Sequence, residues 1–112
     1  MERLRTEIKA QGWIRRAQAQ GLMATVVRRG DADAGALFLK LNRFRDGCEV
    51  LAGTYAPDGT PAWFKATGAG PVTEKEADAY LARQAGYDSD LWVVEIEDPK
   101  GQFRFDEPVI KV

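Results

Sequence analysis

The spacing of apolar residues near the start of the chain predicts an amphipathic helix. Four apolar residues recur at i, i+3, i+4 and i+7 and share one helical face: Ala10, Trp13, Ile14 and Ala17. Thr6 precedes this stripe and is predicted to be the N-cap of the helix. Gly21 follows the stripe, at the position where a left-handed residue ends many helices.

A second apolar stripe predicts a second helix after residue 73. Its inward face comprises Ala77, Tyr80, Leu81 and Ala85. Thr73 and Glu76 have the spacing of a capping box, in which two side chains bind amides at the start of a helix. Gly86 is predicted to end this helix.

Runs of β-branched, aromatic and other apolar residues bounded by turn residues predict strands in the rest of the chain. The predicted strands cover residues 24–29, 36–42, 48–55, 62–66, 91–97 and 102–105. Strands that short turns connect pair antiparallel. We therefore predict an α+β fold in a single domain over residues 1–112, with the order α-β-β-β-β-α-β-β. The predicted sheet is mostly antiparallel, has five to six strands and carries both helices packed on one face.

The composition excludes several classes of chemistry. The 112 residues include no histidine and a single cysteine, Cys48. Without histidine there is no Ser-His-Asp or Cys-His nucleophile and no imidazole metal ligand. One cysteine forms no internal disulfide and no multi-cysteine metal site, which favours a cytoplasmic location. We expect no cofactor and no bound metal.

The chain shows no signal for a membrane or for secretion. The charged residues Glu2 and Arg3 open it, and the apolar run of a secretory signal does not follow them. No segment approaches the roughly 20 apolar residues that a membrane-spanning helix needs. We therefore expect no membrane partner.

Charge is divided unevenly along the chain, although the net charge is only −1. Residues 1–45 hold ten Lys/Arg and four Asp/Glu, whereas residues 46–112 hold six Lys/Arg and thirteen Asp/Glu. The two halves are predicted to attract each other within one chain, and they could also attract two copies of the chain. We expect self-association as a homodimer. The low net charge argues against a nucleic-acid partner.

The most conspicuous polar stretch follows the first predicted strand. Arg28 and Arg29 precede the segment Gly-Asp-Ala-Asp-Ala-Gly, in which Asp31 and Asp33 are two residues apart. Two guanidinium groups and two carboxylates on one loop could bind a charged ligand or a protein partner. The same residues are also typical of a structural turn, because aspartate and glycine tolerate left-handed geometry.

Two further groups of residues have both a functional and a structural interpretation. Glu95 and Glu97 share a face of the predicted strand 91–97, either as an acid–base or metal pair or as solvated residues paired with a cross-strand Lys or Arg. Trp13, Trp63 and Trp92 are interpreted as core or interface residues.

Several segments together resemble a known family. They are Arg15-Arg16-Ala17 with Gly21, residues 27–35, Ala82-Arg83-Gln84 and residues 90–98. Over nearly its whole length the chain is similar to the domain of unknown function 1491 family, of which residues 30–35 are characteristic. Its members are small proteins found mainly in alphaproteobacteria. The resemblance implies a single bacterial cytoplasmic domain and implies no activity.

We expect a non-enzymatic binding or interaction domain that forms a homodimer, with its partner at the loop from Arg28 to Asp33. The alternative is a metal-assisted hydrolase of a phosphorylated or nucleotide substrate that uses only carboxylates as ligands. Its candidate ligands are Asp31, Asp33, Glu95 and Glu97. The third hypothesis is nucleic-acid binding through the basic N-terminal half.

Overall fold

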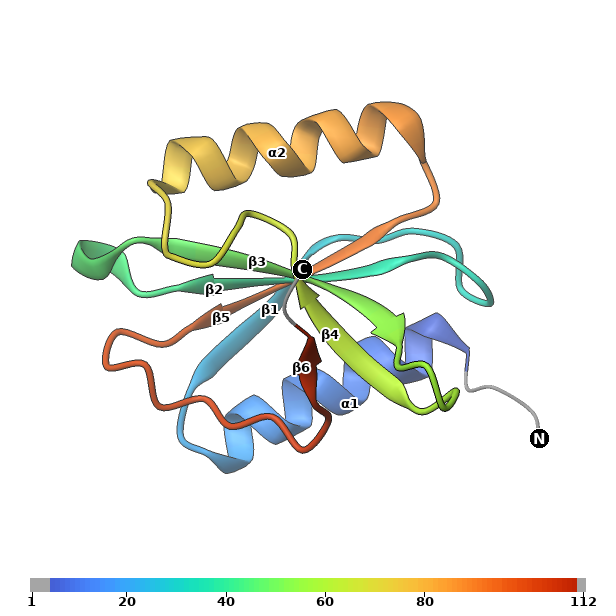
Figure 1. Cartoon of the computed structure of the whole chain (residues 1–112), viewed down its shortest axis with the longest axis horizontal. Coiled ribbons are helices and arrows are strands. Elements are labelled where there is room, and N and C mark those ends of the chain that lie inside the picture. The colour runs from blue at the N-terminus through green and yellow to red at the C-terminus, as the bar shows by residue number, and fades with distance from the viewer. Residues whose placement is uncertain (1–4, 111–112) are drawn as a thin grey trace.

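The order of elements agrees with the prediction. The computed structural model describes residues 5–110, so that Glu2 and Arg3 lie outside the described range. The elements are α1 (Thr6–Ala19), β1 (Met23–Arg28), β2 (Leu37–Asn42), the 3₁₀ turn η1 (Phe44–Asp46), β3 (Cys48–Tyr55), β4 (Pro61–Lys65), α2 (Glu74–Tyr87), β5 (Trp92–Glu97) and β6 (Val109–Ile110). They form one α+β unit with a twisted sheet between two helices (Figure 1).

The six strands form one sheet in the order β1-β5-β2-β3-β4-β6. The pairs β1–β5, β2–β3 and β3–β4 are antiparallel, whereas β2–β5 and β4–β6 are parallel. The sheet is therefore mostly antiparallel, as predicted. Strand β5 lies between β1 and β2, which places the last long strand of the chain inside the sheet, next to the edge strand β1.

The predicted return strand over residues 102–105 is wrong. Strand β5 already has a neighbour on each side, so no edge remains for a hairpin partner. The buried carboxylate of Asp98 instead accepts hydrogen bonds from the amides of Gln102 (2.7 Å) and Phe103 (2.9 Å). This turn directs Phe103 and Phe105 toward Trp13, and the sixth strand forms later, at Val109–Ile110.

The two helices pack on opposite faces of the sheet, so the prediction that they share one face is wrong. Ala10 and Trp13 of α1 pack with Trp92 and alternate residues of β5 and β2. Ala77 and Leu81 of α2 pack on the other side, with a second cluster that includes Phe38, Cys48, Val50, Leu91 and Val93. Strands that are apolar on both faces need a cover on each face, because a single helical layer would leave one of them in water. Figure 1 shows α2 and α1 on either side of the strands.

The tryptophans are core residues, as predicted. Trp13, Trp63 and Trp92 are 7%, 3% and 1% exposed. Trp13 meets Trp63 edge to face at 4.7 Å between ring centroids, and Phe103 and Phe105 complete an aromatic group beneath α1. Such contacts add to the free energy gained by burying the rings.

Two of the four predicted helix ends are correct. Gly21 follows α1 with a φ of 79°, and Thr73 caps α2 through a hydrogen bond from the Glu76 amide to its Oγ1 (3.1 Å). Thr6 is not an N-cap, because it lies inside the helix and its hydroxyl donates to the carbonyl of Gly35 (2.6 Å). Gly86 does not end α2, which continues to Tyr87.

The basic first half and the acidic second half meet within the chain, as predicted. Arg16 pairs with Asp106 and Glu107, both at 3.1 Å. Arg43 pairs with Glu49 at 3.3 Å. Part of the charge asymmetry is thereby satisfied inside one copy. No helix in residues 5–110 combines the length and apolarity needed to cross a membrane.

Replacing the α2 cap tests the one N-cap prediction that the structure confirms. Thr73→Ala removes the acceptor of the Glu76 amide, and we expect the free energy of unfolding to fall by about 1 kcal/mol. Urea denaturation followed by circular dichroism measures this change. An unchanged midpoint would show that the cap contributes nothing to stability.

Candidate functional site

The loop between β1 and β2 is an ordered turn. One carboxylate oxygen of Asp31 accepts hydrogen bonds from the amides of Asp33 (3.1 Å) and Ala34 (2.8 Å). The Asp31 carbonyl accepts a further hydrogen bond from the indole N–H of Trp92 (2.7 Å). The carboxylate and the backbone carbonyl of Asp31 therefore both stabilise the conformation of the loop, and such a carboxylate contact is typical of aspartate in turns.

The same loop caps the first helix with its backbone. The amides of Thr6 and Glu7, at the start of α1, donate to the carbonyls of Asp33 (3.3 Å) and Ala32 (3.0 Å). The first amides of a helix have no partner inside the helix and carry its positive dipole end. The loop carbonyls satisfy two of these amides, which explains why α1 needs no side-chain cap.

Two glycines allow the loop to approach strand β5 closely. A Cβ atom at Gly30 or at Gly35 would overlap the carbonyl oxygen of Asp90. The amide of Asp31 donates to that same carbonyl at 2.9 Å. The segment Gly-Asp-Ala-Asp-Ala-Gly thus joins α1, β1 and β5, and each of its unusual residues has a structural role.

The four predicted binding residues lie together at the end of β1 and on this loop, but they face different partners. Arg28 donates to the carbonyl of Ser89 (3.0 Å). The guanidinium of Arg29 lies over the Trp92 ring at 4.9 Å, and Asp33 pairs with Arg5 at 3.5 Å. Asp31 is held in the turn. A ligand at this loop stays a prediction, and what binds there would meet mainly the exposed side chains of Arg29 and Asp33.

The carboxylates of β5 have different surroundings from those that the sequence indicated. Glu95 pairs with Lys40 on the neighbouring strand at 3.2 Å, so the predicted cross-strand partner is confirmed. The side chain of Glu95 is only 18% exposed and is therefore not solvated. Glu97 is exposed at the end of the strand.

Lys40 is the centre of a charged cluster that sequence reasoning missed. Its side chain is 5% exposed, and its ammonium lies 2.8 Å from Glu74 and 2.8 Å from Asp78, both on α2. Burial alone would lower the pKa of Lys40, but the hydrogen bonds with Asp78 and Glu74 and the charge of Glu95 outweigh burial and raise this pKa. The lysine therefore stays charged and fastens α2 to the sheet. A lysine inside the apolar run Leu37–Leu41 was the available signal.

The carboxylates named for the alternative hydrolase are engaged separately. Asp31 closes the loop turn, whereas Glu95 contacts Lys40 and Asn42. Across residues 5–110, no three Asp, Glu, Cys or His side chains are placed to hold a metal ion. A shared ion requires oxygen ligands within roughly 2.0–2.6 Å of the metal, and the arrangement does not supply them. It thus lends no support to the hydrolase hypothesis.

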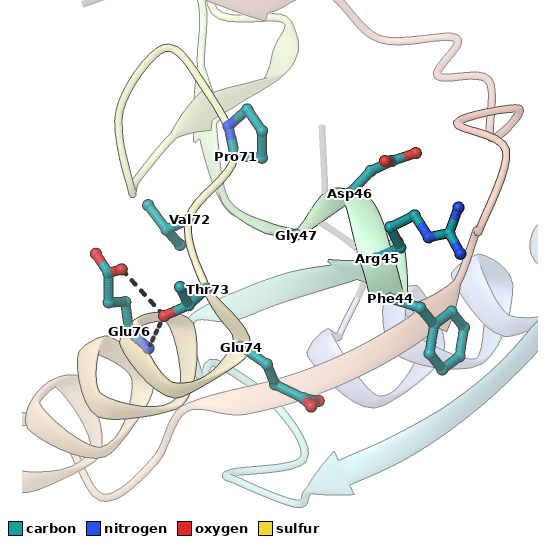
Figure 2. Close-up of a pocket in the computed structure, with 9 residues that line it drawn as sticks. All are labelled: Phe44, Arg45, Asp46, Gly47, Pro71, Val72, Thr73, Glu74 and Glu76. Atoms are coloured by element: carbon teal, nitrogen blue, oxygen red, sulfur yellow. Dashed lines mark hydrogen bonds between the residues drawn. The ribbon is translucent and has the colours of Figure 1, made fainter.

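The lone cysteine is unreactive, and it lies beside a hollow on the surface of the protein. Cys48 is 1% exposed, and burial raises the pKa of its thiol, which disfavours the reactive thiolate. Beside it lies a hollow of about 480 Å³ between η1 and the segment that leads into α2 (Figure 2). Its exposed aromatic residue is Phe44, whose φ of 56° is rare outside glycine.

Comparison with known proteins identifies the family. The model of the family described as "Protein of unknown function (DUF1491)" matches residues 4–106. The chain belongs to the DUF1491 family. Its fold matches a crystal structure of a DUF1491 family protein from Caulobacter crescentus CB15, with 39% identity, a TM-score of 0.84, and 96% of this chain and 100% of that chain covered.

Two solution structures agree with this assignment. An NMR structure of a DUF1491 family protein from the same organism has 38% identity and a TM-score of 0.80, covering 98% of this chain and 99% of that chain. Protein Atu0922 from A. tumefaciens has 28% identity and a TM-score of 0.74, covering 87% of each chain. No curated protein matches this DUF1491 chain.

Alanine at a loop glycine tests the close approach in this DUF1491 protein. Gly30→Ala forces a methyl group against the Asp90 carbonyl, and we expect it to lower the free energy of unfolding by about 2 to 3 kcal/mol. Gly12→Ala is the matched control, because a Cβ there meets no atom within 4 Å. Alanine inside a helix should instead raise stability by about 0.5 to 1 kcal/mol. Equal effects in urea denaturation would contradict the structural role of the loop.

Removal of the buried lysine tests the charged cluster. Lys40→Met leaves three carboxylates without their cation, and we expect a loss of about 2 to 4 kcal/mol at neutral pH, because two of the carboxylates are half exposed. Exposed Lys75→Met is the control and should change stability by less than about 0.5 kcal/mol. Thermal denaturation of both variants measures the difference.

The raised pKa also predicts the pH dependence of this contribution. The folded chain holds the Lys40 proton more tightly than the unfolded chain, so the stabilisation is complete below the ordinary pKa of 10.5. It declines as pH rises from there toward the folded pKa. A difference between wild type and Lys40→Met that vanished between pH 7 and 9 would contradict this assignment.

Proposed function

We propose that this DUF1491 protein is a non-enzymatic binding domain of the bacterial cytoplasm that acts as a homodimer. Three of its polar side chains serve the fold: exposed Asp31 and buried Asp98 hold turns, and buried Lys40 holds α2. A lone buried cysteine fits a reducing compartment. We therefore expect other molecules to bind at the surface of the chain. The surface feature that supports association is the β1 edge of the sheet.

The observation that carries the proposal is the open edge at β1. In the described part of the chain, β1 pairs only with β5, so its other side presents amides and carbonyls without a strand partner. Met23 and Val27 on this strand are 71% and 57% exposed. An edge strand with apolar side chains is a template for pairing with another chain.

The position of α2 leaves one face of β1 uncovered beside the open edge. Helix α2 packs over β3 and its neighbours, whereas Ala24 and Val26 of β1 pack toward α1 on the other face. The face of β1 that carries Met23 and Thr25 therefore has no helix above it. The charged halves of the chain already meet internally, so the support for a dimer comes from this edge rather than from charge.

The solution mass tests the proposal. We expect the mass by light scattering at tens of micromolar to be twice that of the chain. Met23→Lys combined with Val27→Lys should yield a monomer, because charges on an edge strand oppose pairing. Ile8→Lys on α1, at a residue that is 41% exposed, is the matched control and should stay dimeric. A monomeric wild-type protein would overturn the proposal.

A further inference from the structure

We infer that two copies pair antiparallel through their β1 strands, about a two-fold axis that passes beside Thr25. This inference rests on the proposed homodimer and specifies its interface. Each copy contributes a six-stranded sheet, and joining the two β1 edges makes them one continuous sheet. An isologous contact of this kind closes after two copies and leaves neither β1 edge open.

The pattern of side chains along β1 selects the register. In an antiparallel pair, residues directly opposite each other point to the same face, so a two-fold axis must pair odd positions with odd positions. With Thr25 opposite its own copy, Met23 lies opposite Val27 of the second copy. The two exposed apolar side chains of each strand then cover each other across the joint.

The other face of the strand agrees with this register. Ala24 lies opposite Val26 of the second copy, and both are half-buried beside α1. The register with β5 shifts between Val26 and Arg28, which marks a bulge at Val27. A bulge bends the strand, so the joint extends from Met23 no further than Val27, the residue that lies opposite Met23 of the second copy.

Two opposite charges without an ion-pair partner lie near the two ends of β1, Glu97 beside Met23 and Arg28 after Val27, and they complement each other in this arrangement. Glu97 is the β5 neighbour of Met23 and is exposed, and no ion pair is found for it within residues 5–110. Arg28 follows Val27 and likewise has no carboxylate partner among the described residues. Beyond the bulge, Arg28 points to the same face of the sheet as Val93 and Glu97. The proposed register places Arg28 of the second copy near Met23, on the face that carries Glu97.

The composition of the edge favours a second copy over an unrelated strand. Residues 23–27 contain no charge and no proline, which are the residues that edge strands commonly use to prevent pairing. The sequence is complementary to itself in size, because large Met23 and Val27 flank small Thr25 and face each other in the reversed copy. Binding of an unrelated strand would not require β1 to be complementary to its own reversed sequence.

Cysteine cross-linking tests the interface in the full chain. Opposed Cα atoms in antiparallel strands lie about 4.5–5.5 Å apart, within the range that a disulfide spans. Thr25→Cys should therefore form a disulfide-linked dimer when mild diamide oxidises the two thiols, and a reductant should reverse it. Met23→Cys is the matched control, because residue 23 of the second copy lies four residues away from residue 23 of the first along the paired strands. Native Cys48 is buried and does not compete.

The outcomes separate this inference from the proposed function. We expect at least a tenfold higher initial rate of cross-linking for Thr25→Cys than for Met23→Cys. A dimeric wild-type protein in which Thr25→Cys stays unlinked, or links no faster than Met23→Cys, would overturn this interface and leave the homodimer standing. A monomeric wild-type protein would overturn both.

Discussion

The structure depends on the two-sided burial of β5. This strand lies between β1 and β2, sends Trp92, Val94 and Ile96 toward α1, and sends Val93 toward α2. Both faces of the sheet centre are therefore closed by helices. Hydrophobic burial on both faces leaves the edges as the places where the sheet can still gain backbone hydrogen bonds. The β4 edge carries β6, and the β1 edge carries nothing within residues 5–110.

Two polar arrangements hold the layers in place around this strand. On the α1 side, the loop of residues 30–35 supplies carbonyls to the helix start and receives the indole N–H of Trp92. On the α2 side, Lys40 joins Glu74 and Asp78 of the helix to Glu95 of β5. The loop of residues 30–35 and the buried Lys40 thus both position helices on the sheet, which gives each of them a structural role.

Local signals in the sequence predicted much of the fold. The capping box at Thr73, the stripes of both helices and the five long strands depend on neighbouring residues, and the structure contains them. The helix faces and the pairing of β5 depend on contacts between distant segments. The sequence placed Glu95 on a solvated face of its strand, whereas its side chain is mostly buried beside Lys40. Lys40 is 55 positions away and contacts Glu95 only through the parallel pairing of β2 with β5. The loop residues were found as a group, but their internal partners required the structure.

Amide hydrogen exchange of β1 by NMR tests the central claim, that the open sheet edge is closed by a second copy. In the dimer every second amide of residues 23–27 faces the second copy, whereas the amides between them bind β5. The account predicts that both sets are protected at high protein concentration and that the outward set loses its protection on dilution, while the inward set keeps it. Outward amides that exchange at the unprotected rate at every concentration would contradict it.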